Sequence, residues 1–326
     1  MNIKNSNKMH EITYDDAEIN IKELFSVLWK SKLTIIVITA FFALSSVLYA
    51  LSLPNIYKSE AILNIDSGSN SSASLGGLGG IASMVGINLP NSDGDKGKYA
   101  ISTIKTRSFL KHLLAFEGVL PSLMAAKSYD DNSKKLIFDP EIYNENNKEW
   151  VRKPRKNQQS KPSYLETYPT YLFQVNVAQD PENQNFVTMS VEHLSPIFAK
   201  EFLELIRKEA NELLRNKDLS ESSDAIKFLE AEITRASLVT MKDAINQLVQ
   251  AQLEIQMMAK ISPEYVLKIV EPPFIPEDKF SPIRSLICII GTMIGGIFAI
   301  LWVLIRFYLI SPFWRSYFGY SASSKS

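Results

Sequence analysis

The chain has 326 residues, and its 35 lysines and arginines balance 35 aspartates and glutamates, so the formal net charge is zero. It therefore lacks the basic surplus with which proteins bind nucleic-acid phosphates, and we expect no nucleic acid partner. A hydrophobic content of 46% argues against general disorder. The single cysteine (Cys288) excludes a disulfide within the chain, and the three scattered histidines form no local metal motif, so no cofactor is expected.

The N-terminal segment, residues 1–32, ends in an amphipathic pattern. Its apolar positions recur at the spacing of one helix face and are Ile21, Leu24, Phe25, Leu28 and Trp29. We expect a helix lying at the inner leaflet of a membrane before the chain turns into it.

Two long uncharged runs predict transmembrane helices. A stretch of 25 residues beginning at Leu33 carries no charge, and neither does a stretch of 21 residues beginning at Ser285. About 20 apolar residues suffice to cross the hydrocarbon layer, and core helices seldom stay uncharged on every face for that length. We place the two spans at 33–53 and 285–306.

Basic residues beside the spans predict the orientation. The flanking residues are Lys30, Lys32, Arg306, Arg315 and Lys325. Positive residues next to a span stay in the cytoplasm, whereas long loops are exported regardless of their charge. Both termini, 1–32 and 307–326, should therefore be cytoplasmic, with residues 54–284 forming one exported domain.

The exported domain begins with a mixture of strand, loop and helix patterns. Strands are predicted at 56–65, 171–177, 186–191 and 265–270, and a helix at 99–117. The Ser- and Gly-rich stretch 67–97 is predicted to be an apolar loop facing a neighbouring subunit or the membrane. The polar stretch 130–161 is expected to be a loop. Its basic run 152–156 favours a solvated segment, the alternative being contact with an anionic glycan or a lipid pyrophosphate.

Residues 197–262 predict a long helical hairpin, because 66 residues pass without glycine or proline and apolar positions recur every three or four residues. A turn is expected near 237–240, where Thr240 and Asp243 resemble a capping box. Two helices alone leave apolar surface uncovered, which indicates self-association. The candidate oligomer seam comprises Ile226, Leu229 and Ile233.

Catalytic motifs are missing from the sequence. It contains no G-x-S-x-G, H-E-x-x-H or C-x-x-C. The adjacent acids at 15–16 and 130–131 lie in polar segments typical of solvated turns. We expect no enzymatic activity.

A proline cluster leads into a glycine-containing second span. The prolines are Pro272, Pro273, Pro276 and Pro282, and the glycines are Gly291, Gly295 and Gly296. Proline lacks an N–H and favours extended geometry, so we expect a stiff strut that sets the height of the domain above the bilayer. The glycines permit close approach of a neighbouring helix, from another subunit or from a partner protein.

This arrangement resembles the Wzz-type polysaccharide co-polymerases, which determine the chain length of surface polysaccharides. The segments EINIKELFSVLWKSK, TIKTRSFL, SVEHLSPIFAKEFLELI and DAIKFLEAEI are similar to family segments. The resemblance implies a bacterial inner-membrane protein with a periplasmic α+β domain, in which a long helical hairpin stands on a small mixed α/β base anchored by two transmembrane helices.

The same resemblance implies the partners. Family members form homo-oligomeric rings and act, without catalysis, beside a separate membrane polymerase that makes O-antigen or a related glycan on undecaprenyl pyrophosphate. A second hypothesis stays open: a transmembrane adaptor that activates a separate cytoplasmic tyrosine kinase in capsule export. That role would rest on Phe313, Trp314, Tyr317 and Phe318, which interfacial anchoring explains equally well.

Overall fold

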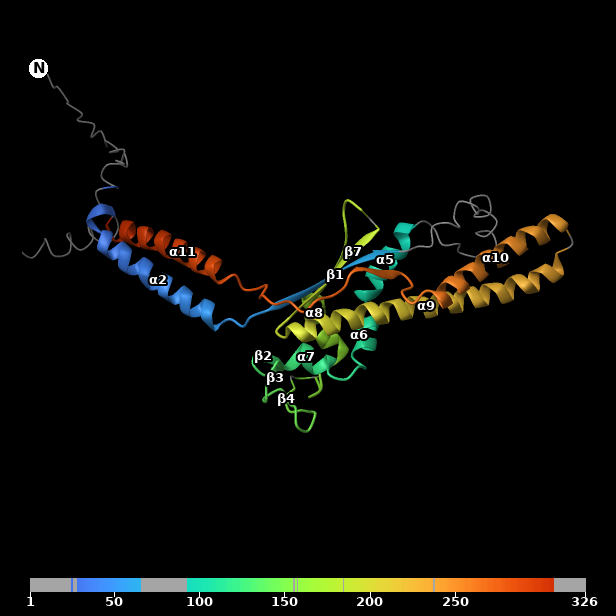
Figure 1. Ribbon diagram of the computed structural model, residues 1–326. Helices are drawn as coiled ribbons and strands as arrows, with labels where there is room; N and C mark the ends of the chain where they lie inside the picture. Colours follow the sequence, from blue (N-terminus) through green and yellow to red (C-terminus); the bar gives the residue numbers. More distant parts are fainter. Residues whose placement is uncertain are drawn as a thin grey trace, which may run out of the picture. The chain divides into compact units, whose positions relative to one another are not determined.

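The computed structural model describes residues 25, 28–65, 93–154, 156, 158–183, 185–236 and 238–307 (Figure 1). The chain divides into two compact units, one holding the two apolar runs and the other spanning residues 54–282. Several expectations lie outside the described residues. They concern Ile21 and Leu24 of the N-terminal helix, most of the 67–97 loop, and the aromatic residues of the C-terminal tail.

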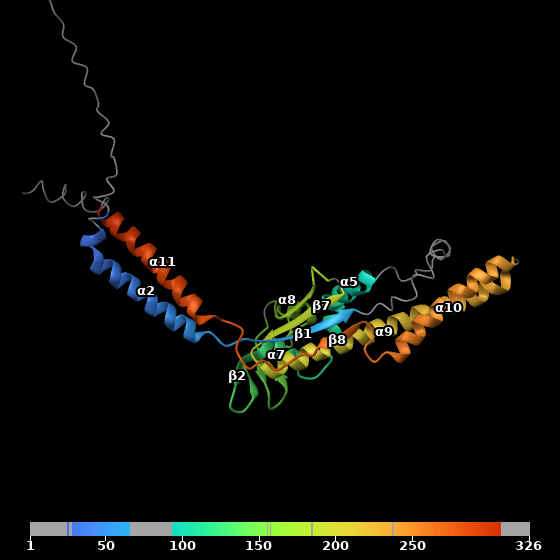
Figure 2. The same cartoon turned by 45° about the horizontal axis from the view of Figure 1, so that its top comes forward.

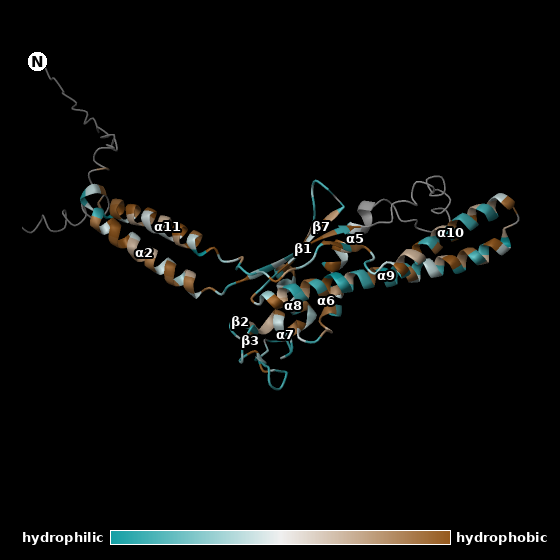
Figure 3. Ribbon diagram, in the orientation of Figure 1, coloured by the Kyte–Doolittle hydropathy of each residue, from teal (hydrophilic) through white to brown (hydrophobic). Residues whose placement is uncertain are grey.

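Two apolar helices, α2 (Lys32–Ser52) and α11 (Arg284–Ile305), pack against each other in the first unit. Both are long and apolar enough to cross a membrane, judged by length and composition. Nearly all their side chains are exposed or half-buried, and Figure 3 shows both as predominantly hydrophobic. Exposed apolar surface of this extent is unfavourable in water. The pair therefore fits a membrane protein with two spans.

A four-stranded antiparallel sheet forms the centre of the second unit, in the order β6–β7–β1–β8 (Figure 2). Its strands are β1 (Tyr57–Ile65), β6 (Val175–Gln179), β7 (Phe186–His193) and β8 (Leu267–Glu271). Buried and half-buried residues alternate along β1, because successive side chains of a strand point to opposite faces. One face of the sheet therefore lines the core.

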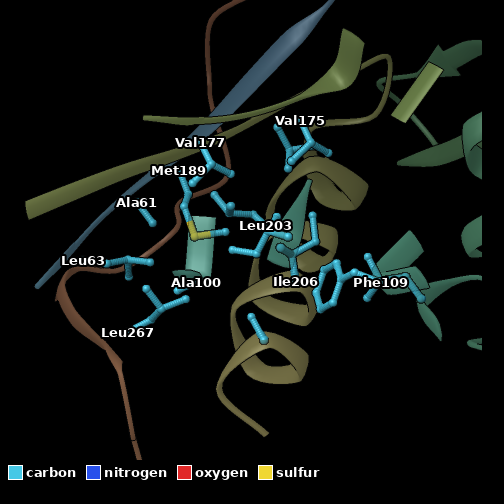
Figure 4. Close-up of a cluster of buried hydrophobic side chains, with 14 of the residues drawn as sticks. Ala61, Leu63, Ala100, Phe109, Val175, Val177, Met189, Leu203, Ile206 and Leu267 are labelled. Carbon is cyan, nitrogen blue, oxygen red and sulfur yellow. The ribbon is translucent and has the colours of Figure 1, made fainter. Parts of the chain in front are cut away.

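Five helices contribute most of the other residues of this core. They are α5 (Asp93–Ile104), α6 (Arg107–Leu113), α7 (Val119–Ala125), α8 (Tyr164–Gln174) and the first half of α9 (Pro196–Arg235). Figure 4 shows Leu63, Met189 and Leu267 from three strands meeting Leu203 and Ile206 from α9. The mixed helix-and-strand class predicted from the sequence is confirmed.

Two small hairpins occupy the stretch that was expected to be a polar loop. They pair β2 (Ala126–Asp130) with β3 (Lys135–Phe138), and β4 (Tyr143–Asn144) with β5 (Glu149–Trp150). The prediction of a continuous loop was therefore wrong for the residues of these strands. The turn begins at Asp131, directly after Asp130 ends β2. The carboxylate of Asp130 accepts hydrogen bonds from the backbone N–H of Asn132 and the hydroxyl of Ser133 in this turn.

The long helix α9 is followed by α10 (Val239–Ile261), and the two pack against each other. Ser195 caps α9 by accepting a hydrogen bond from the backbone N–H of Phe198 at 3.2 Å. The break between Arg235 and Val239 lies where the sequence predicts a turn. The predicted capping box was wrong, because α10 begins at Val239, ahead of Thr240, with no side-chain cap.

The strand expected at 171–177 is confirmed only for its last three residues. Residues up to Gln174 belong to α8, and only from Val175 onward does the chain join the sheet. Ser163 caps α8, and the buried Tyr171 donates a hydrogen bond from its hydroxyl to the carbonyl oxygen of Ile104 at 2.9 Å. These contacts favour a helix despite the aromatic and branched residues that suggested a strand.

Candidate functional site: the proline-rich segment, the glycine face and the helical arm

The proline-rich segment follows β8 without forming a helix. No residue from Pro272 to Pro282 is helical, as the absence of proline N–H groups predicts. Pro273 and Pro276 are buried, whereas Pro272 is exposed and Pro282 half-buried. The segment therefore lies on the surface of the second unit, held by two of its prolines.

Hydrogen bonds fix this segment to the start of β1. The backbone N–H of Phe280 donates to the carbonyl oxygen of Ile56 at 2.9 Å. The backbone N–H of Ile56 in turn donates to the carbonyl oxygen of Ser281 at 2.8 Å. The hydroxyl of Ser59 donates to the carbonyl oxygen of Phe274 at 2.7 Å. The two chain segments that lead to the apolar helices are thus joined to each other within the second unit.

The glycine face of α11 packs against α2 of the same chain. A Cβ atom at Gly295 would lie 2.5 Å from the Cβ atom of Phe42, and one at Gly291 would overlap Ser46. The expectation that these glycines admit a helix of another subunit or protein is therefore corrected for Gly291 and Gly295. Gly296 differs, because a Cβ atom at that residue would meet no atom within 4 Å in the described part of the chain, its own helix backbone aside.

The helical arm, defined as α9 from Leu229 onward together with α10 up to Leu248, has a small core of its own. Leu229 is only 1% exposed and packs with Ala236, Ile245 and Leu248. Its assignment to a seam between chains is corrected, since the side chain is covered by the chain itself. Ile233 packs at the edge of this cluster and Ile226 is half-buried.

Asn211 joins α9 to the strand that returns from the arm. Its side-chain oxygen accepts hydrogen bonds from the N–H groups of Val266 (3.0 Å) and Leu267 (2.8 Å), and its side-chain nitrogen donates to the carbonyl oxygen of Leu267 at 3.0 Å. Sequence reasoning missed this contact. A lone amide within the apolar stripe of a helix was the available signal, because a buried amide needs partners.

Charged contacts hold the same region. Arg207 of α9 pairs with Glu264 at 3.0 Å, and the second carboxylate oxygen of Glu264 accepts from the N–H of Ile269 at 2.9 Å. On α6, His112 contacts the nearly buried Glu209 of α9 through its Nε2 atom at 2.7 Å. Together these pairs hold the part of α9 that precedes the arm within the second unit.

His193 is a structural residue at the end of β7. Its Nε2 lies 2.9 Å from the carbonyl oxygen of Ser122, and its Nδ1 accepts from the N–H of Ser195 at 3.0 Å. The ring also contacts Phe198, with centroids 4.4 Å apart. Burial lowers the pKa of His193 to about 4, so the ring is neutral near pH 7.

The basic run at 152–156 is anchored through Arg152, which forms an ion pair with Glu166 and donates to the carbonyl oxygens of Gln159 and Ser160. The hydrogen bond to Glu166 raises the pKa of Arg152. These contacts tie the loop to α8, which favours the structural interpretation of this residue over contact with an anionic ligand.

Known proteins resemble this chain in sequence and in structure. Residues 17–115 match the family model described as Wzz, chain length determinant protein. No curated protein matches the sequence. A solved structure described as a full-length bacterial polysaccharide co-polymerase is 14% identical, with 90% of this chain and 99% of that chain covered and a TM-score of 0.41. A fragment of WzzB, a polysaccharide co-polymerase from Salmonella Typhimurium, is 16% identical, with 70% and 100% covered and a TM-score of 0.32.

Proposed function

We propose that this chain, whose residues 17–115 match the family model of the Wzz chain length determinant proteins, is a member of that family and regulates the length to which a surface polysaccharide grows. The family match carries this proposal. It takes in the first apolar helix, strand β1 and helices α5 and α6. We propose further that the chain catalyses no reaction itself, in keeping with a sequence that lacks catalytic motifs.

For its location we propose the bacterial inner membrane. In this arrangement residues 33–53 and 285–306 cross the bilayer, residues 54–284 lie in the periplasm, and both termini lie in the cytoplasm. The basic residues beside the two helices support this orientation. The exposed apolar surfaces of α2 and α11 support lipid as their surroundings.

We propose that identical chains assemble into a ring that acts as a scaffold for a separate membrane polymerase. The polymerase would extend O-antigen or a related glycan, carried on undecaprenyl pyrophosphate. The half-buried Ile226 and Ile233 and the exposed Phe228 support the outer part of α9, from Ile226 onward, as the surface for self-association. Apolar side chains at such positions gain from burial against another chain.

Deletion of the gene in its own bacterium tests the function. Lipopolysaccharide or capsule from the deletion strain should still contain polymer, but the gel ladder should lose its preferred length, and a plasmid-borne copy should restore it. Loss of all polymer while the polymerase is still expressed would show that the chain is needed for synthesis and does not merely set its length.

A further inference from the structure

Exposed apolar side chains gather on the proline-rich segment. Phe274, Ile275 and Phe280 are each about half exposed, at 48%, 49% and 50%. Pro273 and Pro276, on either side of Phe274 and Ile275, are buried, so the segment turns these two prolines to the domain and its large side chains outward. Large apolar groups that face outward together mark a contact surface.

These side chains surround one place, the start of β1. The carbonyl oxygen of Phe274 accepts the hydrogen bond from Ser59, and the ammonium group of the adjacent Lys58 lies 5.2 Å from the centre of the Phe280 ring. A lysine beside an exposed aromatic ring is the pairing that occurs where a protein meets the headgroup layer of a bilayer, with the ring at the boundary and the ammonium group in the polar layer.

Short stretches of chain connect this place to both apolar helices. Phe280 is four residues from Arg284, where α11 begins, and its N–H donates to Ile56, which is four residues beyond Ser52, where α2 ends. Four residues span at most about 14 Å. The headgroup region on each side of the hydrocarbon core is about 5–8 Å thick. Both connections are therefore too short for the segment to lie far from the bilayer surface.

We propose that Phe274, Ile275 and Phe280 form an interfacial contact with the phospholipid bilayer, separate from the two spans. The proposal rests on the proposed transmembrane placement of α2 and α11. The charged residues 277–279 (Glu, Asp and Lys) lie between the apolar groups, and zwitterionic headgroups accommodate both signs of charge. The contact therefore depends on apolar burial, and a bilayer of phosphatidylcholine suffices for it.

Site-specific fluorescence in vesicles tests the proposal. The full chain carrying Cys288→Ser receives one new cysteine, labelled with an environment-sensitive dye, at Ile275 or Phe280. The matched control is Leu253 of α10, which has a similar exposure of 45%. In phosphatidylcholine vesicles containing lipids with a nitroxide on the headgroup, we expect quenching at 275 and 280 to exceed that at 253 by about two-fold or more, since quenching needs contact with the headgroup layer.

A label at Ile294, in the middle of α11, separates the possible failures. Quenching there by nitroxide on the acyl chains, together with labels at 275 and 280 that behave like the one at 253, would overturn the interfacial contact and leave the span in place. Lack of quenching at 294 would overturn the transmembrane placement itself. Labels at 275 and 280 that are shielded from both nitroxide lipid and aqueous iodide would mean that another protein chain covers the segment, which also contradicts the proposal.

Discussion

One added methyl group at Gly295 should separate α2 from α11, whereas the same change at the next residue should not. A Cβ atom at Gly295 would lie 2.5 Å from the Cβ and 3.0 Å from the Cγ of Phe42, while one at Gly296 would meet nothing within 4 Å. Both changes replace glycine by alanine in the same helix. The gain in helix propensity, about 1 kcal/mol, is therefore common to the two variants and cancels when they are compared.

The size of the effect follows from the distances. Carbon atoms in contact lie about 3.5–4.0 Å apart, so Phe42 must retreat by about 1 Å, and a gap of that size forfeits a quarter to a half of each neighbouring dispersion contact. Overpacking typically costs about 1–3 kcal/mol, and no hydrophobic driving force compensates between helices in lipid. We expect Gly295→Ala to weaken the helix pair by about 2 kcal/mol relative to Gly296→Ala. Phe42→Ala should not relieve the overlap, because the nearest atom is the Cβ that alanine keeps.

The measurement is a titration of the full chain from mild detergent into dodecyl sulfate. Separation of the helices is followed by energy transfer between dyes at Leu33 and Ile305, both exposed, in a chain carrying Cys288→Ser. Equal midpoints for Gly295→Ala and Gly296→Ala would refute the close packing of α2 on the glycine face of α11.

Three further changes test the second unit through urea unfolding of the full chain in detergent. Asn211→Ala should lower the free energy of unfolding by about 3 kcal/mol because it leaves buried backbone groups without partners. Asn216→Ala, on the exposed side of the same helix, should change it little, and equal effects of the two changes would contradict the role of Asn211. The pKa of His193 is about 4 against an ordinary 6.5, so between these pH values only the unfolded chain binds the proton. The free energy of unfolding should therefore be at its full value above about pH 6.5 and fall by up to about 3 kcal/mol toward pH 4. A His193→Gln variant that keeps the same pH dependence would exclude this cause. Leu229→Ala should destabilise the arm by about 2–4 kcal/mol. Phe228→Ala, which removes a side chain that is 45% exposed, should not destabilise it. A larger loss of stability for Phe228→Ala than for Leu229→Ala would mean that Leu229 lies at a contact between chains.

Long uniform patterns in the sequence predicted the helices well. The spans placed at 33–53 and 285–306 agree within one residue with α2 and α11, and the stretch without glycine or proline coincides with α9 and α10. In each case many residues favour the same conformation, so the preference of any single residue matters little.

Short elements were missed in the stretch that forms the two small hairpins. The turns of the two small hairpins contain Lys134 and Lys148 with positive φ angles of 51° and 54°. Glycine or asparagine normally occupies such positions. The strands themselves are only two to five residues long, and the residues around them are polar, so the sequence suggested a continuous polar loop. The tertiary contact of Tyr171 with Ile104 likewise fixed α8 against local strand propensity.

Sequence spacing revealed close approach at the glycines without identifying the partner. Gly291 and Gly295 lie four residues apart and share a helix face, which any neighbouring helix could use. Only the structure places Ser46 and Phe42 of the same chain there. The same limit applied to Leu229, where apolar periodicity predicted burial correctly but could not distinguish a neighbouring chain from α10.

The helix α9 takes part in two separate cores, and this determines how the arm is held. From Ala199 to Leu214 its apolar face packs in the core of the sheet, and from Leu229 onward it packs with α10. Starting a helix is costly and extending it is not. The contacts near the sheet therefore stabilise the first turns, and the arm continues from a helix that is already formed.

The return path completes this argument. Asn211 and Arg207 bind the chain just after α10 ends, at Leu267 and Glu264, so both helices of the arm are fastened to the sheet at the same place. The opposite end, at Leu238 and beyond, exposes apolar side chains. A neighbouring chain that binds the outer arm would therefore act on the sheet through one continuous helix of about 60 Å, and no flexible linker would absorb the movement.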